Sequence, residues 1–230
     1  MSEWWTYGLS SFLLFSPRTY YRLFEIYNAA IWPGQILGVG LGLAIPALAG
    51  RAAMDVRRGR SIAVILAACW LWVAIAFQAI RYATINWAAV YFAWAFGLEA
   101  ALLIWTGVVR GRLEFSRPAD LAGRAGLWIF LFALVAEPLA GPLLGRGWKQ
   151  VETFGVAPDP TAVATLGILL LARGRCRWLL IVIPAIWCAI TGATLLAMKA
   201  PDAWIPPLAA ALVISLAVWQ NRRSRSLGTF

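Results

Sequence analysis

Long apolar stretches separated by short charged loops run along most of this 230-residue chain. A helix needs about 20 apolar residues to cross the hydrocarbon core of a bilayer. The pattern therefore predicts an all-α, polytopic membrane bundle of about seven spans over residues 30–220. These apolar segments lie near residues 30–50, 61–80, 87–109, 125–145, 160–173, 178–198 and 204–220. The fifth is short, about 21 Å at helical rise, so it either thins the bilayer locally or is a re-entrant piece.

Composition supports a membrane protein and excludes an ordinary soluble enzyme. Hydrophobic residues make up 62% of the chain and charged residues 13%, against about 25% charged in a soluble domain. The net charge of +10 fits basic cytoplasmic loops better than nucleic-acid binding in so apolar a chain. If all seven segments cross from an outer N-terminus, 14 of the 20 basic residues lie inside. The positive-inside rule thus predicts a cytoplasmic C-terminus, with residues 221–230 as a basic tail.

Residues 1–29 form a different kind of segment. Ser16-Pro17 is typical of a helix start, and aromatic residues then recur at helical spacing opposite a polar face. This pattern predicts an amphipathic helix lying on the outer membrane surface, and a lid or a partner-docking surface is the alternative. The expected anchoring side chains are Trp4, Trp5, Tyr20, Phe24 and Tyr27.

Small residues at four-residue spacing mark two of the predicted spans. Gly34, Gly38 and Gly42 form one stripe, and Gly141 and Gly145 form another. Such stripes let two helix backbones approach closely. The partner is either another helix of this chain or another subunit.

Two carboxylates inside predicted spans are the candidate proton, cation or ligand site. They are Glu99 and Glu137, with Arg81 as a partner near the cavity mouth. Intramembrane acids usually face a bundle interior or a wet cavity. Antiparallel neighbouring spans could bring the two within reach of one another. The structural alternative is an inter-helix hydrogen bond, to one of Thr106, Gln78 or Thr191.

Other chemistry is not indicated. The chain has no His, its three Cys include no CxxC pair, and no catalytic or metal-binding motif occurs. We expect neither an enzyme nor a metal site. Tryptophans deep in the predicted spans leave room for a bound lipid, quinone or pigment, although filling of helix interfaces is the simpler interpretation.

The N-terminal motif resembles that of a known family. The carrying residues are Ser2-Glu3-Trp4-Trp5-Thr6-Tyr7, the run from Phe12 to Tyr21, Tyr27-Asn28 and Trp32-Pro33. Over about the first thirty-five residues the chain resembles domain of unknown function family 6064, a family of bacterial membrane proteins. The resemblance implies a multi-pass protein of the bacterial inner membrane and assigns no functional residue.

Two function classes follow from these patterns. The first, favoured by the glycine stripe and the aromatic N-terminal segment, is an accessory or scaffold subunit of a larger membrane complex. The alternative is a small-molecule or proton/cation-coupled transporter that uses the intramembrane glutamates. Expected partners are the lipid bilayer and either complex subunits or further copies of the chain, with no nucleic acid.

Overall fold

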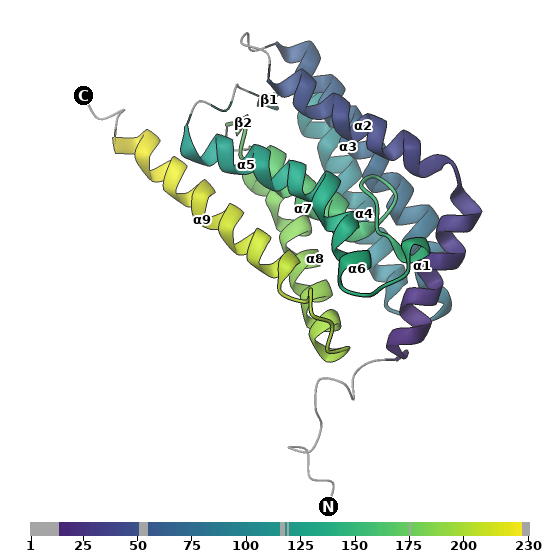
Figure 1. Ribbon diagram of the computed structural model, residues 1–230. Helices are drawn as coiled ribbons and strands as arrows, with labels where there is room; N and C mark the ends of the chain where they lie inside the picture. Colours follow the sequence, from purple (N-terminus) through teal and green to yellow (C-terminus); the bar gives the residue numbers. More distant parts are fainter. Residues whose placement is uncertain (1–13, 51–54, 116–117, 119, 175, 227–230) are drawn as a thin grey trace, which may run out of the picture.

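The computed structural model describes residues 14–50, 55–115, 118, 120–174 and 176–226, and this part of the chain is mostly helical (Figure 1). The helices are α1 (Pro17–Ile31), α2 (Gly34–Ala49), α3 (Val56–Trp72), α4 (Ala89–Leu103), α5 (Leu121–Leu131), α6 (Glu137–Leu143), α7 (Pro158–Leu169), α8 (Cys176–Ala197) and α9 (Ile205–Ser226). Wide π-helical turns extend α3 over Val73–Ala79 and α4 over Ile104–Val109, and join α5 to α6 over Phe132–Ala136. Short 3-10 turns cover Tyr82–Thr84 and Trp148–Gln150. Two short antiparallel strands, β1 (Glu114–Phe115) and β2 (Ala172–Arg173), pair Glu114 with Arg173 and Phe115 with Ala172.

Four helical stretches are long and apolar enough to cross a membrane, which fits a membrane protein. They are Val56–Thr84, Ala89–Val109, Leu121–Leu143 and Cys176–Ala197, in the places of the second, third, fourth and sixth predicted segments. Helices α1 and α2 would make a fifth span only as a broken pair, because they meet at 89° (Figure 1). The remaining predicted segments are also helical, as α7 and α9. Seven full-length spans are therefore not what length and hydropathy show in the described residues.

Helix α1 begins where the sequence predicts. The Ser16 hydroxyl caps it by accepting a hydrogen bond from the Thr19 backbone N–H at 3.2 Å, with proline in the first turn. The aromatic stripe of this helix, however, faces the bundle: Tyr20, Phe24 and Tyr27 are at most 3% exposed. Their rings contact those of Phe77 and Tyr82, which lie beyond the end of α3, and not lipid. An anchor formed by these three rings is thus not what the structure shows, and Trp4 and Trp5 lie outside the described residues.

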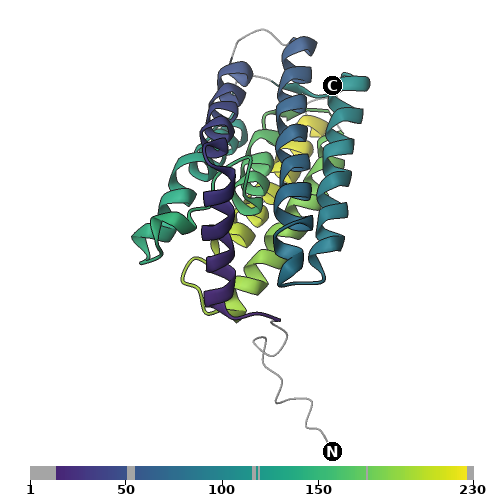
Figure 2. The ribbon, with the colours of Figure 1, turned by 90° about the vertical axis from the view of Figure 1, so that its right-hand side faces the viewer.

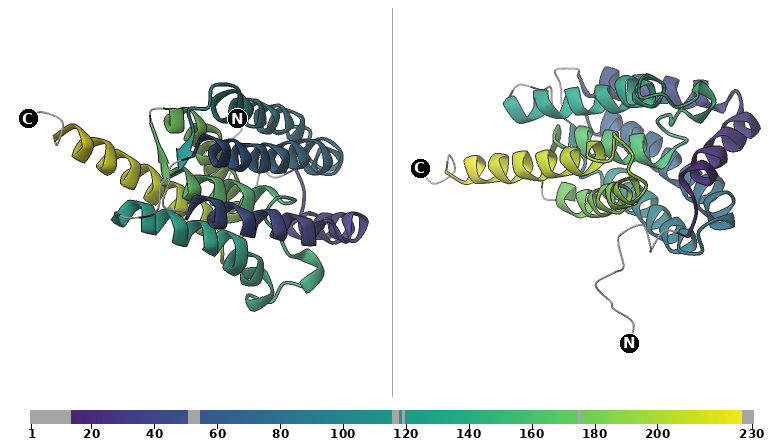
Figure 3. Two further views of the ribbon diagram at one scale, coloured as in Figure 1. Left: turned by 90° about the horizontal axis from the view of Figure 1, so that it is seen from above. Right: turned by 60° about the horizontal axis from the view of Figure 1, so that its bottom comes forward.

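Helix α7 lies inside the bundle and is buried at every position (Figure 3). It packs against α3, α5, α8 and α9. A short helix without a charged outer face is stable only when other helices enclose it, and the few polar side chains of α7, Asp159, Thr161 and Thr165, are themselves buried. The contact with α5 is close because Gly126 and Gly167 face each other: a Cβ on Gly126 would lie 2.5 Å from the Gly167 carbonyl oxygen.

The glycine stripe of α2 packs against this same chain. A Cβ on Gly38 would lie 2.5 Å from the carbonyl oxygen of Phe154, and one on Gly42 would lie 2.5 Å from Leu134 Cδ1. Phe154 belongs to the segment that precedes α7, so α2 lies along that segment; Figure 2 shows α2 on the side of the bundle that faces the viewer. Gly34 has only Ile31 near it, at 4.0 Å. Intramolecular packing is therefore the use that the structure makes of this stripe.

Gly38 and Gly40 provide a matched test of this contact. We expect Gly38→Ala to lower the free energy of unfolding by about 1–3 kcal/mol, because its methyl group would overlap a backbone carbonyl. A Cβ at Gly40, on the same helix, meets nothing within 4 Å, so Gly40→Ala should be neutral or slightly stabilising. Thermal unfolding in detergent measures both. Equal stability of the two variants would contradict the packing of α2 on Phe154.

Candidate functional site

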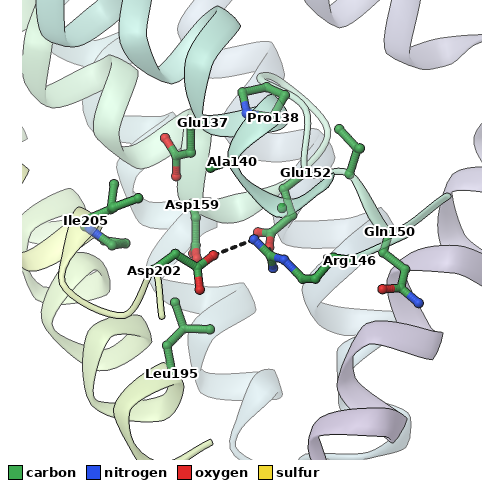
Figure 4. A pocket seen from close by; sticks show the side chains of 13 residues that line it. Glu137, Pro138, Ala140, Arg146, Gln150, Glu152, Asp159, Leu195, Asp202 and Ile205 are labelled. Carbon is green, nitrogen blue, oxygen red and sulfur yellow. Dashed lines mark hydrogen bonds and ion pairs between the residues drawn. The ribbon is translucent and has the colours of Figure 1, made fainter. Parts of the chain in front are cut away.

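Four carboxylates and one arginine surround a small cavity beside the start of α7 (Figure 4). We call this group the acidic centre. Its members are Glu137, Arg146, Glu152, Asp159 and Asp202. They come from α6, the α6–α7 segment, α7 and the turn between α8 and α9. The cavity measures about 20 Å³, which is room for one water molecule.

Arg146 is the cation of the acidic centre. Its Nη2 pairs with Asp202 Oδ2, and its Nη1 lies 3.5 Å from Glu152 Oε1. The guanidinium also lies over the ring of Tyr21 of α1, 5.0 Å from the ring centroid. One side chain thus connects three parts of the chain that are far apart in sequence.

Two of the predicted packing glycines serve this arginine. A Cβ on Gly141 would lie 2.9 Å from Arg146 Nε, so the bare backbone leaves the space that the guanidinium occupies. The Arg146 backbone N–H donates to the Gly141 carbonyl oxygen at 2.9 Å. Gly145 has φ +93°, a conformation open to glycine that turns the chain just before Arg146. Gly141 therefore contacts a side chain of its own loop, while a Cβ on Gly145 would meet nothing within 4 Å.

Asp159 joins α7 to α8. Its carboxylate accepts hydrogen bonds from Trp187 Nε1 at 2.7 Å and from Thr191 Oγ1 at 2.8 Å. Ala157 precedes the helix, and Pro158 and Asp159 lie in its first turn. A carboxylate there is also favoured by the positive end of the helix. Thr191, a predicted partner for a glutamate, bonds Asp159 instead.

The acidic centre has more negative groups than positive ones. Buried oxygens without a hydrogen-bond partner remain on Glu137, Glu152 and Asp202. Burial, followed by the charge of Asp159, raises the pKa of Glu152 well above its ordinary value. Burial also raises the pKa of Asp159 to about 6, although the hydrogen bonds from Thr191 and Trp187 oppose the shift. Carboxylates in such surroundings can take up and release a proton near neutral pH.

The structure separates the residues that the sequence predicts as one site. The charged neighbours of Glu137 are Asp159, Glu152, Asp202 and Arg146, and Glu99 is not among them. Glu99 is fully buried on α4, and neither of its carboxyl oxygens has a hydrogen-bond partner. Arg81 lines a different hollow, with Arg18 and Arg22.

The other suggested hydrogen-bond partners of these glutamates are also placed otherwise. The Thr106 hydroxyl donates to the Leu102 carbonyl oxygen at 2.7 Å. The side chain of Gln78 is buried without a hydrogen-bond partner. No predicted hydrogen bond to Glu99 or Glu137 is therefore seen.

The tryptophans deep in the predicted spans divide into two groups. Trp70 and Trp187 are buried and donate to Thr165 at 2.9 Å and to Asp159. Trp94 and Trp128 point outward, 77% and 71% exposed, as expected for side chains that face lipid. Burial with a hydrogen bond accounts for the first pair and an outward position for the second, so these four side chains do not favour a quinone or pigment site. In the part of the chain that the structure describes, no three His, Cys, Asp or Glu side chains are placed to hold a metal ion.

The chain belongs to the family of unknown function DUF6064, whose sequence pattern matches residues 18–227. This match confirms the resemblance drawn from the N-terminal motif. It also extends the similarity from about thirty-five residues to nearly the whole bundle, including the acidic centre. Neither a curated protein nor a solved structure matches the chain.

A pH series tests the surroundings of Asp159. Below the ordinary pKa of 3.8, Asp159 is protonated in both the folded and the unfolded protein, so its burial costs no ionisation energy. Above the raised pKa of about 6 it is ionised in both states, and the folded protein bears the full cost of a buried charge. The contribution of Asp159 to stability is thus lost as pH rises through this window, by about 3 kcal/mol at most. We expect Asp159→Asn to flatten the fall in melting temperature over this range. A slope identical to that of the wild-type protein would contradict the burial of an ionisable group here.

Proposed function

We propose that this protein is a proton-coupled transporter of a small solute in the bacterial inner membrane, and that the acidic centre is its proton-binding site. This is the transport alternative drawn from the sequence, with the site moved from Glu99 and Glu137 to the group around Arg146. One observation carries the proposal: buried carboxylate oxygens without partners lie around a water-sized cavity that is lined by a single guanidinium.

Charge explains why such a group would bind a proton. Four carboxylates against one arginine leave an excess of negative charge in a largely buried site. Ionising all of them there is costly, so protons neutralise part of the group. Each protonation changes the charge that Arg146 meets, and therefore changes its contacts with Asp202 and Glu152.

The contacts of Arg146 give protonation a route to the shape of the bundle. The guanidinium pairs with the α8–α9 turn through Asp202 and with the α6–α7 segment through Glu152, and it lies over Tyr21 of α1. Protonation of a carboxylate that pairs with Arg146 would weaken that pair and shift the balance between arrangements of these three parts of the bundle. A transporter requires at least two such arrangements, which open the site to opposite sides of the membrane.

The backbone near the site supports the same interpretation. Residues 144–157, apart from one short 3-10 turn, are not helical, and Phe154 within them is fully buried. In membrane bundles, irregular backbone is tolerated where protein encloses it, and discontinuous helices mark many transporter sites. Helix α7, shorter than a span, starts directly after this segment.

The orientation belongs to the proposal. All seven predicted segments are helical in the described residues. An outer N-terminus with seven crossings places 14 of 20 basic residues on the cytoplasmic side, as the positive-inside rule prefers. On this arrangement the acidic centre lies toward the outer side of the membrane.

The accessory-subunit function stays a prediction with less support. Its main argument is the glycine stripe of α2, and Gly38 and Gly42 of that stripe contact Phe154 of this chain. The geometry of the acidic centre now favours transport.

Proteoliposomes on a solid-supported membrane test the function. We expect a pH jump to produce a transient current with the wild-type protein, because protons enter a buried site. The current should fall several-fold in Glu152→Gln and Asp159→Asn, which each remove one titratable group. Glu114→Gln makes the same chemical change in β1, outside the acidic centre, and should leave the current unchanged.

Melting curves of all three variants show whether the proteins are folded. Wild-type currents no larger than those of empty liposomes would contradict the proposal. So would currents that both variants of the acidic centre retain in full.

A further inference from the structure

A second hollow lies between α1 and residues 81–85, and it shares no lining residue with the acidic centre. We call it the arginine groove. Its volume is about 410 Å³, within the range of sites that hold small organic molecules. The lining residues are Arg18, Thr19, Arg22, Leu23, Ile26, Arg81, Thr84 and Ile85.

The arginine groove is strongly positive. Three of the eight lining residues are arginines, and none is acidic. Arg22 pairs with Glu25 at 2.8 Å, which offsets one of the three charges. Arg18 stands in the first turn of α1, where no acidic residue occurs and where the helix dipole already makes the helix end positive. Like charges gathered in this way are stabilised by an anion.

The rest of the groove is apolar or small. Leu23 is buried, whereas Ile26 is 47% exposed. The Thr84 hydroxyl donates to the Arg81 carbonyl oxygen at 2.7 Å, which leaves guanidinium groups as the main donors to a ligand. A groove lined by both arginines and aliphatic side chains complements a molecule with an anionic head and an apolar chain.

We propose that the arginine groove binds an anionic phospholipid. Its phosphate lies among the guanidinium groups of Arg18, Arg22 and Arg81, which bind phosphate through paired N–H donors. Its acyl chain follows Leu23 and Ile26. A phosphate ion alone would fill little of a groove of this volume.

The distribution of charge along the chain agrees with this assignment. On the proposed orientation only six basic residues lie outside, and three of them line this one groove. The positive-inside rule makes arginines on the outer side of the membrane uncommon near spans. A bound lipid phosphate would neutralise the three arginines that gather here.

Native mass spectrometry of the full-length protein in detergent tests the proposal. The probes are phosphatidylglycerol, phosphatidylcholine with the same acyl chains, and inorganic phosphate as a competitor. We compare the wild-type protein with R18Q/R22Q/R81Q. The matched control, R57Q/R60Q/R112Q, removes three exposed arginines from around the start of α3 and the end of α4.

We expect the wild-type protein and the control to bind phosphatidylglycerol at least about tenfold more tightly than R18Q/R22Q/R81Q does. Phosphatidylcholine should show a smaller difference, because its head carries no net charge. Equal phosphatidylglycerol binding by all three proteins would overturn the proposal. Displacement of the lipid by millimolar phosphate, with no preference for the lipid, would overturn it in favour of a free-anion site. Equal melting temperatures show that the proteins are folded.

Discussion

The guanidinium of Arg146 partly neutralises the four carboxylates of the acidic centre, and the packing of the loops at this end of the bundle depends on that interaction. A buried carboxylate without a cation is costly, and removal of one partner of a buried pair commonly costs about 3–5 kcal/mol. Arg146 meets Asp202 and Glu152 and lies over Tyr21, so it fixes the α8–α9 turn, the α6–α7 segment and α1 relative to one another. Because it is outnumbered by carboxylates, this balance is incomplete, and a proton is the simplest charge that completes it.

Close packing at glycines brings those groups together. Gly126 and Gly167 let α7 pack closely against α5. Gly38 lets α2 pack closely against Phe154, in the segment that precedes α7. Gly141 leaves the space that the guanidinium of Arg146 occupies. In lipid, where the hydrophobic effect does not drive helices together, such contacts determine which helices are neighbours. The position of the acidic centre thus depends on glycines, which let the surrounding helices and loops approach closely.

Much of the fold follows from local sequence signals. Short-range patterns predict the cap at Ser16, the aromatic stripe of α1 and the seven apolar segments. Helix α1 begins after that cap, and a helix lies in each of the seven segments. What α1 packs against is not a local property. An amphipathic face looks the same whether it meets lipid or the rings of Phe77 and Tyr82, so the sequence could not place it.

The candidate site shows the same limit more strongly. Glu137 is found from sequence because a charge inside an apolar segment is conspicuous. Arg146, Glu152 and Asp202 stand in loops, where a charge is ordinary, and only the fold shows that they meet around one largely buried cavity. One sequence feature does point to these loop residues: the α6–α7 connection carries both positive and negative charges directly before a short apolar segment.

Infrared difference spectroscopy tests the central claim most directly, because the carbonyl band of a protonated carboxyl group reports its titration. Our account predicts that such a band appears when the purified protein is taken from about pH 8 to about pH 5. The band should be strongly reduced in the double variant Glu152→Gln/Asp159→Asn and retained in Glu99→Gln. Absence of a titrating carboxyl band in the wild-type protein, or full retention of the band in the double variant, would contradict a proton-binding acidic centre.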